Sequence, residues 1–117
     1  EAADANDKIL YLKRMLQSSI PRFIFSLGTM CVLAPIIEEI FFRRFLFVAL
    51  RKRMAFVWAL GISAALFAIV HPNMALGAIG GIYLGYVYEK GKSLPDNILI
   101  HGMANFTISV VSMLVRR

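Results

Sequence analysis

Residues 34–43 read Ala34-Pro35-Ile36-Ile37-Glu38-Glu39-Ile40-Phe41-Phe42-Arg43, which places two adjacent glutamates and an arginine in an otherwise apolar stretch. A charged side chain at the centre of a bilayer costs about 2.5 kcal/mol or more, so ionisable groups at that depth mark functional sites. The stretch therefore predicts a membrane helix that carries a reaction site.

The whole chain has the composition of a membrane protein. Its 117 residues are 59% hydrophobic and only 17% charged, and their mean hydropathy is +0.69. A soluble domain of this length needs a more polar surface to cover its core. The net charge of +6 lies in short clusters that flank apolar segments, mainly Arg51-Lys52-Arg53 and Lys90 with Lys92. We therefore expect membrane lipid, and not nucleic acid, as a partner.

The hydropathy pattern predicts an all-α fold, a polytopic transmembrane bundle of about four spanning helices. The expected spans are 23–50, 54–70, 74–88 and 98–115. Residues 1–20 form a polar, amphipathic lead-in that predicts an interfacial helix, and residues 21–117 form the membrane core. The chain does not begin with methionine, so we expect it to be a fragment or core of a longer protein.

Several residues predict local features of these helices. Pro35 predicts a kink or break just before the glutamates. Gly77, Gly81 and Gly85 form a tandem GxxxG row, which predicts the close approach of another helix. Asp96 is a candidate N-cap for the last helix.

Three pairs of residues in or beside the apolar segments have i,i+4 spacing, so each pair is expected to project from one face of its helix. The pairs are Glu39 with Arg43, Phe67 with His71, and His101 with Asn105. If the helices bundle, both histidines of the chain can meet the glutamate pair in one hydrated pocket. A carboxylate beside an imidazole can activate water as a general base, and neutral N–H donors can bind an oxyanion. The set therefore best supports hydrolysis of an amide bond.

Other protease designs fit the sequence less well. It has no HExxH and no GxSxG, and the only aspartates, Asp4, Asp7 and Asp96, offer no pair at membrane depth. One carboxylate and two imidazoles do suffice for a zinc site, so a metalloprotease with Glu38, His71 and His101 as ligands stays open. A non-catalytic membrane adaptor or immunity protein, with the polar pairs serving helix packing, stays open as well.

With these three motifs in order, the chain resembles the CPBP intramembrane proteases, also called the Abi or CAAX-protease family. Residues 38–43 match EExxxR, residues 67–71 match FxxxH and residues 101–105 match HxxxN. The resemblance implies an all-helical intramembrane endopeptidase whose members commonly have six to eight spans. It covers about residues 34–110.

The resemblance also implies roles for the motif residues. Glu38 and His71 would activate the catalytic water, and His101 and Asn105 would form the oxyanion site. Glu39 and Arg43 would support the site. No cofactor is favoured, and zinc is the alternative. The implied substrates are membrane-associated peptides or proteins, either prenylated proteins or bacterial peptides.

Compact motif spacing and short loops favour a bacterial member of that family, with a multi-pass chain in the cytoplasmic membrane. The positive-inside rule then places the basic loops at 51–53 and 90–92 on the cytoplasmic side. Arg22 and the terminal Arg116-Arg117 oppose this orientation.

Overall fold

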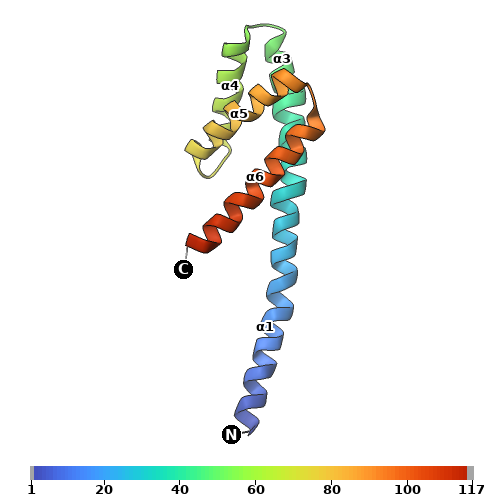
Figure 1. The fold of residues 1–117 in the computed structure, drawn as a ribbon, viewed down its shortest axis with the longest axis vertical. Helices are drawn as coiled ribbons and strands as arrows, with labels where there is room; N and C mark the ends of the chain where they lie inside the picture. The colour runs from blue at the N-terminus through green and yellow to red at the C-terminus, as the bar shows by residue number, and fades with distance from the viewer. Residues whose placement is uncertain (1, 116–117) are drawn as a thin grey trace.

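The computed structural model describes residues 2–115, and these form helices joined by short turns (Figure 1). No strand occurs among the described residues, so the all-α prediction is confirmed. In chain order the helices are α1 (Ala2–Gly28), the π-helical η1 (Thr29–Leu33), α2 (Ala34–Glu39), the π-helical η2 (Ile40–Phe47), α3 (Val48–Arg51), α4 (Phe56–Ile69), α5 (Met74–Gly91) and α6 (Leu94–Val115).

The first five elements follow one another without a break and form a single long rod, along which the molecule extends 73 Å (Figure 1). The expected separate interfacial helix over residues 1–20 is therefore the first part of this rod. The expected break at Pro35 is also wrong, because helical backbone continues through it. Just before Pro35 the rod widens to a π-helix, in which the Ala34 N–H donates to the Thr29 carbonyl five residues back. This wider turn accommodates the proline ring, which would otherwise press on the carbonyl one turn earlier.

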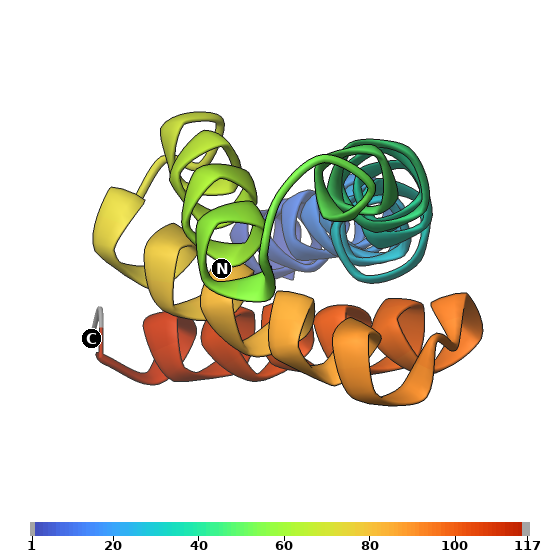
Figure 2. The ribbon, with the colours of Figure 1, turned by 90° about the horizontal axis from the view of Figure 1, so that it is seen from above.

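The other helices gather at the end of the rod that is remote from residue 2. α6 crosses the rod diagonally in the view of Figure 1, and seen from above α4 and α5 lie beside the rod (Figure 2). α6 begins earlier than residue 98, and its cap is Ser93, whose hydroxyl accepts from the Asp96 N–H at 3.3 Å. The candidate cap Asp96 is instead in the first turn of the helix.

The glycine row predicted from the sequence forms the contact between α4 and α5. A Cβ atom added at Gly81 would lie 2.9 Å from the Ala64 Cα, and one at Gly77 would lie 3.0 Å from the Ala68 Cα. The two backbones can approach this closely because the glycines have no side chain. Gly77 also faces the Cβ of His71, so this contact helps to set the position of that histidine.

Two of the four expected spans are long and apolar enough to cross a membrane within the described part of the chain. By length and composition these are Asn6–Arg51 and Leu94–Val115. α4 has 14 residues, about 21 Å at ~1.5 Å per residue, which is shorter than the ~30 Å hydrocarbon core. α4 is thus shorter than the span expected over residues 54–70.

An ion pair closes the hairpin end of the bundle. Arg51 donates from Nη2 and Nε to the Glu89 carboxylate, at 2.9 and 3.1 Å, and from Nη1 to the Met54 carbonyl. Lys92 adds a third donor to Glu89 at 3.1 Å. The end of the rod, the loop before α4 and the end of α5 are thus held together, which brings both basic loops to one end of the molecule.

We predict that Gly81→Ala destabilises the protein, because the new methyl group would meet the backbone of Ala64. Overpacking of this kind costs about 1–3 kcal/mol of the free energy of unfolding. The matched control is Gly61→Ala in the same hairpin, where the added methyl meets nothing within 4 Å. There the better helix propensity of alanine should leave stability unchanged or raise it by up to about 1 kcal/mol. Thermal unfolding in detergent compares the two, and equal effects would contradict the packing described.

We predict that acid weakens the hairpin end through Glu89. Hydrogen bonds from Arg51, and secondarily from Lys92, lower the pKa of Glu89 from about 4.5 to about 2. Because its pKa is lower in the folded state, Glu89 stabilises the fold above about pH 4.5, and this contribution is lost as the pH falls towards 2. Unfolding measured at pH 6 and pH 3 should show a loss that is smaller in Glu89→Gln; the same loss in both proteins would contradict it.

Candidate active site

The centre of the polar cluster is the carboxylate of Glu39, which is 0% exposed. Arg43, one turn later on the rod, places its Nε 3.3 Å from Glu39 Oε2. His101 on α6 donates from Nδ1 to Glu39 Oε1 at 2.9 Å. The predicted Glu39–Arg43 and His101 positions therefore meet in a part of the site that is closed to solvent.

Glu38 lies on the open side of the same cluster and is 29% exposed. Its Oε2 lies 3.2 Å from His101 Nε2 and 3.8 Å from His71 Nε2. The shorter distance puts the Glu38 carboxylate in direct polar contact with the His101 ring. The 3.8 Å between Glu38 Oε2 and His71 Nε2 is longer than a direct hydrogen bond, and the His71 side chain is 21% exposed. Between Glu38 and His71 the site is accessible.

Both imidazole rings have their orientation fixed through Nδ1. His71 is in the turn after α4, and its Nδ1 is hydrogen-bonded to the Phe67 carbonyl, an acceptor that requires the proton on that nitrogen. The Nδ1 of His101 is fixed in the same way by Glu39. Each ring therefore presents Nε2 to Glu38, and His71 presents it with a free lone pair when the ring is neutral.

Phe67, the first residue of the FxxxH motif, packs against several of these groups. Its ring centroid lies 4.1 Å from that of His71 and 5.6 Å from that of His101. The guanidinium of Arg43 lies over the same ring at 4.6 Å, a distance at which the ring attracts a cation. An aromatic side chain at this position orients one histidine and gives the buried arginine a favourable surface.

Asn105 lies further along α6 and does not reach the glutamates. Its Nδ2 donates at 2.7 Å to the Met30 carbonyl. In the π-helical register of η1, that carbonyl would pair with the N–H five residues later, which Pro35 lacks. The amide of Asn105 thus replaces the missing donor and ties α6 to the rod. An amide nitrogen carries a second N–H, which stays available to another acceptor.

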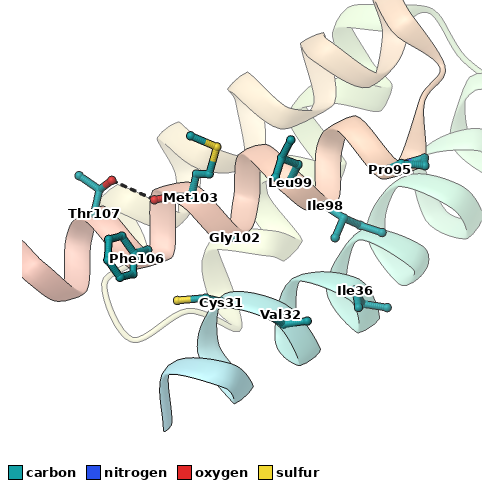
Figure 3. Close-up of a pocket in the computed structure, with 10 residues that line it drawn as sticks. All are labelled: Cys31, Val32, Ile36, Pro95, Ile98, Leu99, Gly102, Met103, Phe106 and Thr107. Atoms are coloured by element: carbon teal, nitrogen blue, oxygen red, sulfur yellow. Dashed lines mark hydrogen bonds between the residues drawn. The ribbon is translucent and has the colours of Figure 1, made fainter. Parts of the chain in front are cut away.

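Gly102 lets α6 approach the rod at the same level. A Cβ there would overlap the Cys31 carbonyl oxygen. Beside this crossing runs an apolar groove of about 670 Å³, open on one side (Figure 3). Figure 3 shows Cys31, Val32 and Ile36 of the rod on one wall and Leu99, Met103 and Phe106 of α6 on the other. Gly102, which lines the groove, follows His101 directly in the chain.

The motif analysis missed Asn97, a residue in the first turn of α6 that is 0% exposed. Its Nδ2 donates to Glu39 Oε2 at 3.2 Å and to the Leu84 carbonyl at 2.8 Å. The sequence did contain a signal, because Asn97, His101 and Asn105 are spaced by four residues and share one face of a helix.

The open side of the cluster also has the donor set of a metal site. Glu38, His71 and His101 each offer a ligand atom, and these atoms lie within 4.8 Å of one another. Each histidine holds its other nitrogen on a carbonyl or a carboxylate, as metal-binding histidines do. One carboxylate with two imidazoles is a set that zinc accepts.

Comparison with known proteins places this cluster in a family. Residues 20–107 match the family described as type II CAAX prenyl endopeptidase Rce1-like. This chain belongs to that family. All six predicted site residues lie within the matched part of the chain, as does Asn97.

A curated relative of this CAAX endopeptidase family is the Bacillus subtilis (strain 168) protein named "Putative membrane peptidase YdiL". It is 31% identical over 85 residues, which cover 70% of this chain and 35% of the relative. The chain thus spans about a third of the length of that relative. No solved structure shows significant similarity to the chain.

We predict that Asn105 and Pro35 are energetically coupled. Asn105→Ala leaves the Met30 carbonyl without its donor, which should cost about 0.5–1.5 kcal/mol of the free energy of unfolding. In a Pro35→Ala background the backbone regains an N–H that can reach this carbonyl, so the same change should cost less. A double-mutant cycle by thermal unfolding should give a coupling of about 0.5 kcal/mol or more. Additive effects would contradict the replacement of the missing donor.

Proposed function

We propose that this CAAX endopeptidase family member is an intramembrane peptidase of the glutamic type, which hydrolyses a peptide bond with a water activated by Glu38 and His71. The observation that supports this most directly is the accessible space between Glu38 Oε2 and His71 Nε2, which are 3.8 Å apart. Both atoms can accept a proton from a water molecule that lies against them.

In the proposed reaction the water oxygen attacks the carbonyl carbon of the scissile bond and forms a C–O bond. The proton that the water loses passes to the Glu38–His71 pair. When the C–N bond breaks, this proton goes to the leaving amine, so the pair returns to its starting state. No group of the protein becomes covalently attached to the substrate.

The oxyanion of the intermediate needs donors on the other side of the substrate carbonyl. We assign these to the second N–H of Asn105, the one that the Met30 carbonyl does not use, and to His101, whose Nε2 must carry a proton and donate it to the oxyanion in place of Glu38. Glu39 and Arg43 do not contact the substrate in this scheme. Glu39 keeps the His101 ring in place, and Arg43 balances the charge of Glu39.

A zinc-dependent peptidase is the second candidate, favoured by the convergence of Glu38, His71 and His101. These three residues would then be the ligands. Zinc would supply Lewis-acid activation of a water or of the substrate carbonyl.

The proposed substrate is a membrane-associated peptide or a lipid-modified protein. The apolar groove between the rod and α6 opens to one side, so an apolar segment can lie in it without entering water. The basic loops at 51–53 and 90–92 occupy one end of the bundle, and we propose that this end faces the cytoplasm of a bacterial cell. Anionic lipid head groups would contact it there.

We predict that Glu38→Gln abolishes cleavage of a fluorogenic membrane-peptide library while leaving thermal unfolding unchanged. The amide has nearly the shape of the carboxylate but cannot take a proton from water. Metal analysis of the same preparations distinguishes the two mechanisms. Cleavage without bound metal supports the glutamic type, whereas one equivalent of zinc with chelator-sensitive cleavage supports the second.

Arg44→Gln is the matched control, because Arg44 is an exposed charge on the same rod and makes no contact with the cluster among the described residues. It should retain full activity. Undiminished cleavage by Glu38→Gln would overturn both peptidase mechanisms, whereas a wild-type protein that cleaves nothing would favour a non-catalytic role such as an adaptor.

A further inference from the structure

Asn97 is a polar side chain at the centre of the helix bundle that the proposed reaction does not use. It is 0% exposed, and it connects three elements, since it lies on α6 and donates to Glu39 of α2 and to the Leu84 carbonyl of α5. Burying a polar side chain is unfavourable unless its groups are paired. The pairing of this one is therefore informative.

The contacts of Asn97 suit an amide and no other side chain of its size. Both partners, a carboxylate oxygen and a carbonyl oxygen, are acceptors, and they take the two N–H groups of Nδ2 at 3.2 and 2.8 Å. An aspartate here would place a carboxylate against that of Glu39. A leucine would leave Glu39 Oε2 with Arg43 as its remaining donor.

The oxygen atom of the Asn97 amide is not hydrogen-bonded. Asn97 Oδ1 is buried and has no hydrogen-bond partner among the described residues, and the same is true of Arg43 Nη1. A buried acceptor without a partner is unfavourable, and an apolar residue would avoid this penalty. The unpaired oxygen of Asn97 is therefore unfavourable, whereas its nitrogen bonds Glu39 and joins α6 to α5.

We propose that Asn97 is a positioning residue for His101 and acts through Glu39. The Asn97 N–H and the Arg43 Nε together occupy Glu39 Oε2, which leaves Oε1 directed at His101 Nδ1 at 2.9 Å. Asn97 is one turn before His101 on the same helix, so it fixes the carboxylate relative to the element that carries the imidazole. This role of Asn97 rests on the proposed function only in its expected effect on peptide cleavage.

Removing the amide should change the His101 ring and not the His71 ring. His71 is oriented by the Phe67 carbonyl, to which Asn97 makes no contact. The chain has two histidines, so the imidazole nitrogen signals of the protein labelled with ¹⁵N-histidine can be assigned with one His71→Gln variant. We expect Asn97→Asp and Asn97→Ala to shift the His101 Nδ1 signal and leave those of His71 in place.

The same variants should lower kcat about 10–100-fold with little change in KM, since partners that orient active-site ligands have effects of this size. A residue that only holds α6 in place would lower thermal stability and leave the His101 signals of the folded protein unchanged. The matched control is Ser63→Ala. Its hydroxyl is similarly buried but donates only to Leu60 of its own helix, so neither signal should move.

Unshifted His101 signals in folded Asn97→Ala would overturn the proposal. If neither variant folds, hydrogen exchange of the Asn97 side-chain amide in the wild-type protein decides, because an amide with both N–H groups bonded exchanges slowly and rapid exchange contradicts the geometry. The nitrogen signals do not depend on turnover. A wild-type protein that cleaves no peptide would therefore refute the proposed function and still leave this inference open to the test.

Discussion

The structure depends on the burial of one carboxylate. An unpaired charge in a low-dielectric interior is expensive, so a buried glutamate must have its oxygen atoms occupied by donors. Glu39 obtains them from Arg43 on its own rod and from Asn97 and His101 on α6. Because these donors come from separate elements, the Glu39 carboxylate has all of them only when α6 crosses the rod at one particular position along its length.

Two adjacent glutamates on a helix point in different directions, so the two carboxylates of this pair have different environments. Glu39 faces the inside of the bundle, whereas Glu38 faces an accessible space and is partly exposed. His101 lies between them, with one ring nitrogen towards each carboxylate. The closed carboxylate can thus orient the imidazole while the open one remains available for chemistry. A single glutamate could not have both environments.

The sequence predicted the elements that follow from periodicity. The i,i+4 pairs identified which residues share a helix face, and the glycine row identified the α4–α5 contact, since both depend only on helix geometry. It did not predict the unbroken helix at Pro35, because the side chain that replaces the missing donor, Asn105, is distant in sequence. Asn97 was missed for a related reason, since its partners are on other helices and no motif contains it.

The shortness of α4 has a consequence for the supply of water. If the basic loop before α4 lies at one membrane face, a helix of 14 residues, about 21 Å long, ends inside the ~30 Å hydrocarbon layer. The turn that contains His71, Pro72 and Asn73 is then non-helical backbone at that depth, where it is tolerated only if it is covered by protein or hydrated. Pro72 and Asn73 are exposed in this chain. Where no other protein segment covers it, the turn marks the place at which water enters the hydrocarbon layer, and the proposed hydrolysis would draw its water from there.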